Sequence, residues 1–172
     1  MYKTDTVSTL PNSWDTEARQ EFYVAIAYDG FSAGTSALKL YEHLQEQFGR
    51  DLDIRRTVRS FAWLGTSDAS SQQDEKKPDM IIVASHRSGS LPIGLQNWLA
   101  EELAESSDCP QALVALVNIG NAEEPAAIYQ QLARAANRGG ATFFHHQPGG
   151  DSEDERIDLA EHRLEKGGGL NE

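Results

Sequence analysis

Apolar runs, separated by segments with helical spacing, dominate the middle of the chain. Residues 22–28, 79–85 and 112–120 are continuous apolar runs rich in strand-forming side chains, which is typical of strands buried on both faces. Residues 52–58 alternate between apolar and polar positions, as a half-covered or edge strand does. Residues 141–146 form a last, shorter run. The pattern therefore predicts five strands.

Apolar side chains at helical spacing fill the intervals between these strands. The segment 35–49 repeats them three and four residues apart and ends at Gly49, a residue type favoured where helices end. The segments 91–106 and 124–140 show similar spacing, whereas 59–78 turns polar and predicts a short helix or a loop. The apolar positions of the first two helices are Ala37, Leu40, Tyr41, Leu44 and Phe48, and Leu95, Trp98, Leu99 and Leu103.

This alternation of strands and helices predicts an α/β fold with a parallel sheet covered on both faces. Five strands fit a doubly wound sheet in the order 2-1-3-4-5. Ligands of such sheets bind at the carboxyl ends of the strands, where the order reverses between the first and third strands. Three segments, 28–36, 85–90 and 118–121, are expected to meet there.

The length of 172 residues is that of one domain with a full core. We expect an N-terminal arm at 1–20, the folded domain at 21–147 and an acidic C-terminal tail at 148–172. Within the tail, apolar positions at helical spacing predict one more helix over 153–166. These positions are Ile157, Ala160 and Leu164.

Charge excludes two classes of partner. The formal net charge is −12, and a nucleic-acid-binding protein needs a basic face to neutralise phosphates. Anionic membrane surfaces are disfavoured for the same reason. No apolar run approaches the roughly 20 residues of a membrane helix, and the first residues lack the apolar core of a signal peptide. With Cys109 as its single cysteine, the chain is expected in the reducing cytoplasm.

The stretch YDGFSAGTSA (28–37) joins the first strand to the first helix. Backbone N–H groups at a helix N-terminus bind phosphate without a positive side chain, and the hydroxyls of Ser32, Thr35 and Ser36 can add donors. Asp29 opposes this, because its carboxylate would repel a phosphate dianion. A plain strand-to-helix turn capped by Ser or Thr fits the same residues, so both interpretations stay open.

The loop after the third strand carries His86 and Arg87. Arg87 is the only cation in the three loops, so it is the expected partner of a ligand anion or of Asp29. Asp29 and His86, together with Ser32 or Ser88, would resemble a hydrolase triad. The Gly-x-Ser-x-Gly elbow that would support a triad is missing, so a histidine bonded to the backbone is favoured.

Two histidines and the cysteine carry no predicted chemistry. His145 and His146 are neighbours in the last strand, so they point to opposite faces and cannot both bind one metal ion. Cys109 precedes the fourth strand, at the wrong edge of the sheet for the site. No metal site is expected.

Two short motifs resemble those of the flavodoxin-like superfamily. In flavodoxins, a loop of the type Ser-x-Thr-Gly-x-Thr wraps the FMN phosphate, and FSAGTS has Ser32, Gly34 and Ser36 at matching places. GSLPIGLQNWL (89–99) is similar to the Gly-Ser-Ile-Pro-Gly-x-Leu-Lys-Asn stretch of NADPH-dependent FMN reductases, with Gln96 in place of Lys. The resemblance implies a flavodoxin-like fold over about 22–146 and FMN as the cofactor.

Two functions stay open after this resemblance. In the first, the chain binds FMN and acts in electron transfer or flavin reduction, with the redox chemistry left to the flavin. In the second, it is a non-catalytic interaction or regulatory module with a degenerate ligand site, which the short loops and the acidic tail favour. Self-association into a homo-oligomer is open in both. Trp63 is expected in the core, with stacking on the flavin ring as the alternative.

The expected ligand-binding residues are Gly30, Phe31, Ser32, Ala33, Gly34, Thr35, Ser36, His86, Arg87, Ser88, Gly89, Asn118 and Gly120.

Overall fold

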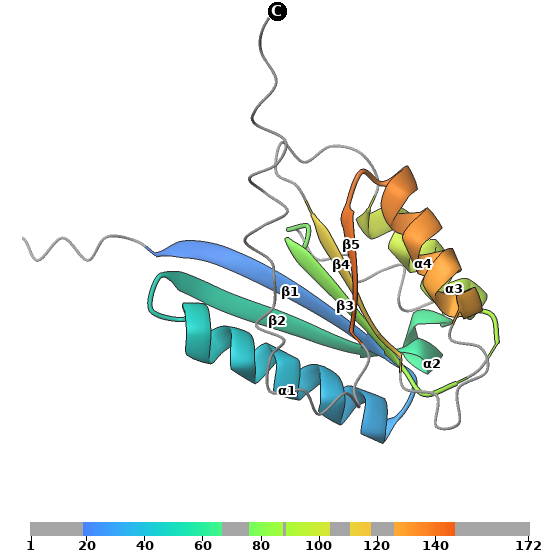
Figure 1. Ribbon diagram of the computed structural model, residues 1–172, viewed down its shortest axis with the longest axis horizontal. Coiled ribbons are helices and arrows are strands. Elements are labelled where there is room, and N and C mark those ends of the chain that lie inside the picture. Colours follow the sequence, from blue (N-terminus) through green and yellow to red (C-terminus); the bar gives the residue numbers. More distant parts are fainter. Residues whose placement is uncertain (1–18, 67–75, 88, 104–110, 118–125, 147–172) are drawn as a thin grey trace, which may run out of the picture.

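The computed structural model describes residues 19–66, 76–87, 89–103, 111–117 and 126–146 (Figure 1). Strands and helices alternate along these residues, as the apolar pattern predicts. The elements are β1 (Gln20–Tyr28), α1 (Phe31–Phe48), β2 (Leu52–Ser60), α2 (Phe61–Leu64), β3 (Met80–Ser85), α3 (Ile93–Glu102), β4 (Ala112–Val117), α4 (Ala126–Arg138) and β5 (Thr142–His146).

All five strands form one parallel sheet in the order β2-β1-β3-β4-β5. In its centre, Ile26 of β1 lies opposite Val58 of β2 and Ile82 of β3. Strand β2 is an edge strand, as its alternating sequence predicts. The order reverses between β1 and β3, so the doubly wound, flavodoxin-like α/β fold is confirmed.

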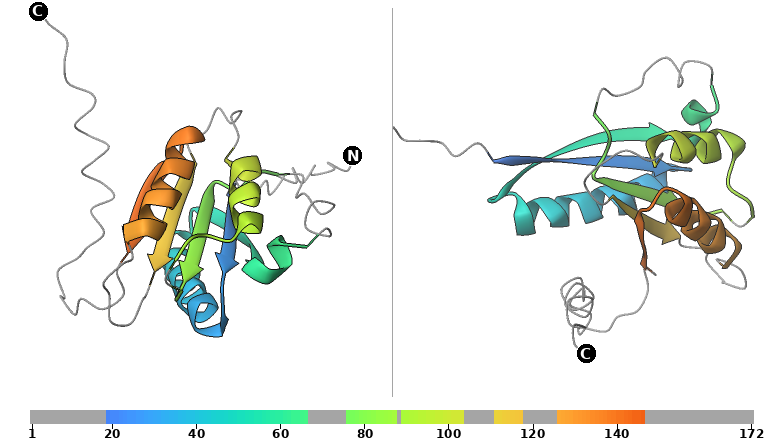
Figure 2. Two further views of the ribbon diagram at one scale, coloured as in Figure 1. Left: turned by 90° about the vertical axis from the view of Figure 1, so that its right-hand side faces the viewer. Right: turned by 90° about the horizontal axis from the view of Figure 1, so that it is seen from above.

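Helices cover both faces of the sheet, and this explains the continuous apolar runs. One face packs against α1 and holds Val24 and Ile26. The other packs against α2, α3 and α4 and holds Ala25 and Ala27 (Figure 2). Successive residues of β1 point to opposite faces. The four residues 24–27 therefore enter one core or the other, which explains why this part of the run is apolar throughout.

The apolar stripe of α3 is confirmed as its core face. Leu95 is fully buried, Leu99 is 1% exposed and Leu103, just beyond the helix, is 2% exposed. Gly94, in the first turn of α3, packs against the backbone of Gly65, which ends α2. The short helix expected in 59–78 is α2, a single turn.

Helix α1 begins earlier than the sequence predicts. Its first turn starts at Phe31 after Gly30, and the Gly34 N–H donates to the Gly30 carbonyl at 2.9 Å. The loop expected over 29–34 is therefore reduced to Asp29 and Gly30. The Thr35 hydroxyl donates back to a carbonyl one turn earlier, as does the Ser36 hydroxyl. Such bonds let these residues sit inside a helix rather than end it.

The far end of α1 is less buried than its apolar spacing predicts, because Phe48 is 44% exposed. Strand β3 pairs with β1 only from Val24 onward, so the amino ends of β1 and β2 extend as two strands without a third. The last turn of α1 therefore has less sheet to cover.

Several expectations fall outside the described residues, among them the helix at 153–166 and the site of Cys109. No helix in the described parts of the chain is long and apolar enough to cross a membrane.

Candidate functional site at the carboxyl edge of the sheet

The carboxyl ends of β1 and β3 bring two of the three expected loops together. Asp29 follows β1, and its amide N–H donates to the Ala84 carbonyl of β3 at 3.2 Å. Of the expected binding residues, Ser88, Asn118 and Gly120 lie outside the part of the chain that the structure describes. That the loop 118–121 contributes to the site therefore stays a prediction.

Asp29 is the centre of the hydrogen bonds at this edge. One carboxylate oxygen, Oδ2, accepts from the Ser85 hydroxyl at 2.5 Å, from the His86 N–H at 2.9 Å and from the Arg87 N–H at 3.2 Å. Ser85 is 2% exposed. The contact between Asp29 and His86 thus runs through the backbone N–H of His86.

This arrangement has a chemical consequence. Consecutive backbone N–H groups that converge on one point form an anion-binding nest. Here the N–H groups of His86 and Arg87 converge on the carboxylate of Asp29. The protein supplies its own anion to the loop after β3, so these donors are already satisfied.

The first turn of α1 retains part of the expected anion-binding capacity. Its N–H groups at Phe31, Ser32 and Ala33 have no acceptor within the helix, and the Gly30 cap provides no side-chain bond. The hydroxyls of Thr35 and Ser36 donate inward to helix carbonyls instead. The turn can therefore offer an anion backbone donors and the Ser32 hydroxyl.

Gly34 is explained by packing inside the protein. A Cβ atom at this position would lie 3.1 Å from the Tyr28 ring. The small residue lets α1 begin directly against the last residue of β1. Packing therefore gives a reason for this glycine that requires no ligand.

The loop between β3 and α3 is held at its far end by contacts that the sequence pattern did not reveal. The Leu91 N–H donates to the side chain of Gln131 in α4 at 2.9 Å. The Leu91 carbonyl accepts from the Gln96 amide at 2.6 Å. Gly89 adopts φ 117°, which favours glycine. Gln131 lies on α4, 40 residues further along the chain, and the apolar pattern of α4 does not predict a contact with Leu91.

Two large apolar side chains stand in solvent at the same edge. Phe31, the first residue of α1, is 90% exposed, and Ile93, the first residue of α3, is 70% exposed. Arg87 is exposed as well. Neither residue belongs to the apolar stripes predicted for these helices, and no conclusion about their exposure was drawn from the sequence.

The remaining candidates for chemistry lie elsewhere. Trp63 is half-buried at the margin of the core formed with α2, α3 and α4, and the Arg59 guanidinium lies 4.9 Å from the centre of its ring. His145 packs against Tyr129, with ring centroids 5.2 Å apart. Burial raises the pKa of the Tyr129 hydroxyl. Within the described ranges, no three metal-ligating side chains form a group.

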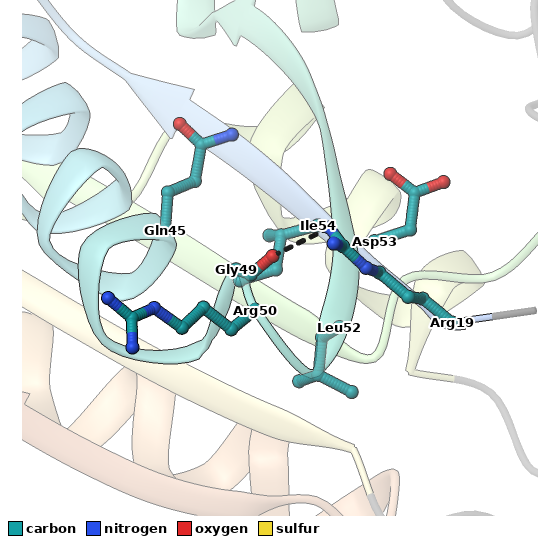
Figure 3. Close-up of a pocket in the computed structure, with 7 residues that line it drawn as sticks. All are labelled: Arg19, Gln45, Gly49, Arg50, Leu52, Asp53 and Ile54. Atoms are coloured by element: carbon teal, nitrogen blue, oxygen red, sulfur yellow. Dashed lines mark hydrogen bonds between the residues drawn. The ribbon is translucent and has the colours of Figure 1, made fainter. Parts of the chain in front are cut away.

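A cavity of about 290 Å³ lies at the opposite, amino edge (Figure 3). There Arg19 donates to the Gly49 carbonyl at 3.1 Å, and the Arg50 side chain extends to the other side of this turn. The cavity is at the wrong end of the strands for a ligand of a doubly wound sheet. Its lining residues are Arg19, Gln45, Gly49, Arg50, Leu52, Asp53 and Ile54.

Comparisons with known proteins give little beyond the architecture. No protein-family model matches the chain, and no curated protein does. One solved structure, a short-chain flavodoxin associated with a non-canonical PDU bacterial microcompartment, is similar over 73% of this chain and 82% of that one, with a TM-score of 0.47 and 11% identity. The strand order described above is what gives this chain a flavodoxin-like fold.

Proposed function

We propose that this chain is a flavodoxin-like interaction or regulatory module whose ligand site is degenerate. One observation carries the proposal: the Asp29 carboxylate accepts the donors of the loop after β3. A ligand phosphate would have to displace that carboxylate or bind beside it. Displacement would leave a half-buried charge without its three donors, and binding beside it would bring two like charges together.

The experiment is a titration of the full chain with FMN, followed by flavin fluorescence. We expect no binding at micromolar FMN and no yellow colour in the freshly purified protein. Asp29→Ala removes the competing charge and frees the Ser85 hydroxyl and the His86 N–H, so it should bind FMN or inorganic phosphate more tightly than the wild type. A yellow wild-type protein, or tight binding by the wild type, would overturn the proposal.

A second function, FMN binding with an electron-transfer or flavin-reductase role, is favoured by a different observation. The first-turn N–H groups of α1 and the exposed Arg87 face the same edge. In this case the phosphate would sit on α1, and the flavin would supply the redox chemistry.

Arg87→Ala tests this second function. A charged hydrogen bond contributes about 1.5–3 kcal/mol, so the variant should bind FMN roughly ten- to a hundred-fold more weakly. Added salt should weaken the wild type more than the variant, because salt screens the lost attraction. Arg50→Glu, at the opposite edge, is the matched control and should bind as the wild type does.

A further inference from the structure

We infer that the acidic segment 151–166 of this chain binds the carboxyl edge of its own sheet, across Phe31 and Ile93 and next to Arg87. The inference goes beyond the proposed function and does not depend on whether FMN binds. It concerns which partner covers the exposed apolar residues of the edge.

The first argument is the exposure of the two apolar side chains. Phe31 and Ile93 are 90% and 70% exposed, against 44% for Phe48 and 43% for Val58. They begin α1 and α3, which follow the neighbouring strands β1 and β3, so both lie at the carboxyl edge (Figure 1). The two helices pack on opposite faces of the sheet, so a segment that covers both side chains has to cross the carboxyl edge.

The second argument is charge. Arg87 is exposed, and no described residue forms an ion pair with its guanidinium. The charge of Asp29 is held by three donors within the protein. Among the described residues, the carboxyl edge therefore carries exposed apolar side chains and a cation without an ion-pair partner, which suits a partner that is both acidic and apolar.

The segment 151–166 has this composition. It holds seven acidic and three basic side chains. Its apolar side chains Ile157 and Leu164 are seven residues apart, so they would share one face of a helix. The same segment can thus supply carboxylates for Arg87 and apolar groups for Phe31 and Ile93.

The third argument is the attachment point. Because β5 is parallel to the other strands, it ends at the carboxyl edge, where the two exposed residues lie. Only β4 separates β5 from β3, a distance of about 10 Å. The four residues 147–150 can span up to about 14 Å. The acidic segment is therefore tethered within reach, at an effective concentration on the order of millimolar.

Tethering is also the reason for choosing this occupant. A second copy of the chain would offer the same segment at the concentration of the protein in solution. In dilute solution this is far below the millimolar effective concentration of the tethered segment. An unrelated acidic protein would have to compete with the tethered segment.

The experiment places a nitroxide spin label on the full chain and measures paramagnetic broadening of its amide NMR signals. Ser152→Cys in a Cys109→Ser background carries the label. Amides near Phe31 and Ile93 should broaden, whereas those of Gly49–Ile54 at the amino edge should not. The broadening should vanish in high salt and in the Phe31→Ser, Ile93→Ser and Arg87→Glu variants. Phe48→Ser and Arg50→Glu, at the amino edge, are matched controls that should leave it unchanged.

Three outcomes would overturn the inference. One is the absence of broadening at the carboxyl edge, and another is broadening that survives in all the carboxyl-edge variants while their spectra stay folded. The third is broadening that occurs only between a labelled chain and a separate isotope-enriched chain, because the segment then acts between copies. The FMN titration is an independent measurement. A negative result in the spin-label experiment therefore leaves the proposed function untouched, and FMN binding by the wild type leaves this inference untouched.

Discussion

Asp29 shows how one side chain can decide what the carboxyl edge is able to bind. Its carboxylate joins the end of β1 to the first residues after β3 through the Ser85 hydroxyl and two backbone N–H groups. These contacts join the two strand ends, and they occupy the donors of the loop after β3 while leaving those of the first turn of α1.

Removing this carboxylate should therefore destabilise the protein. Asp29→Ala leaves the buried Ser85 hydroxyl and the His86 N–H without their acceptor, whereas the Arg87 N–H still has the Ser85 hydroxyl oxygen at 3.2 Å. We expect a loss of about 1–3 kcal/mol in the free energy of unfolding, the usual cost of an unsatisfied buried polar group. Urea unfolding measures it. Asp29→Asn keeps one oxygen acceptor and should lose less; equal stability of the wild type and the Ala variant would mean that water replaces the carboxylate at no cost.

At the scale of helices and strands, α3 packs against the rest of the domain through two kinds of contact. Its apolar stripe is buried against the sheet and α4, while Gly94 brings its first turn onto the end of α2. The stripe depends on side-chain volume, and the glycine contact depends on the absence of a side chain. The two contacts should therefore respond to different substitutions.

Truncation tests the stripe. Leu99 is 1% exposed, so Leu99→Ala should lower the free energy of unfolding by about 2–5 kcal/mol, through lost burial and a residual cavity. Asn97→Ala, on the exposed side of the same helix, is the control and should change stability by less than about 0.5 kcal/mol. A small effect of Leu99→Ala in urea unfolding would mean that the core around it collapses to fill the space.

Adding one methyl group tests the glycine contact. A Cβ at Gly94 would lie 2.6 Å from the Gly65 Cα and 2.7 Å from the Leu64 carbonyl oxygen. Backbone cannot move aside cheaply, so Gly94→Ala should cost about 1–3 kcal/mol from crowding, more than the roughly 1 kcal/mol gained in helix propensity. At Gly65 an added Cβ meets no atom closer than 3.5 Å. Gly65→Ala should therefore be near neutral; a stabilised Gly94→Ala variant would show that α2 can shift.

For the whole molecule, the sheet order predicts unequal stability across the strands. Strand β3 lies between β1 and β4, and its residues Ile81–Ser85 are buried. Strand β5 has five residues and lies at an edge among the described strands. Amide hydrogen exchange of the full chain should be slowest in β3 and faster in β5, because edge strands open locally before the whole domain unfolds. Equal protection of both strands would mean that another segment of the chain covers β5.

Much of this architecture was predictable because buried strands and amphipathic helices leave a strong periodic signal. The run at 22–28 lies in β1, the run at 79–85 coincides with β3 except for its first residue, and the apolar stripe of α3 is its core face. The start of α1 was wrong by several residues, since hydroxyl side chains that usually favour turns bond back to helix carbonyls here. Local propensity could not decide whether these hydroxyl side chains would favour a turn or bond to carbonyls inside a helix.

The sequence by itself determined the class of fold, because burial on two faces dictates which positions are apolar. The strand order was predicted from the doubly wound folds that five alternating strands fit, and the structure confirms it. The sequence also determined the net charge, and with it the classes of partner that are disfavoured. Only the tertiary structure decided what the edge contains. The donors around Asp29, the contact of Gln131 with Leu91 and the exposure of Phe31 and Ile93 depend on where segments far apart in the chain meet. The apolar periodicity of a segment does not predict contacts between distant segments, since it indicates only which side of a helix or strand is buried.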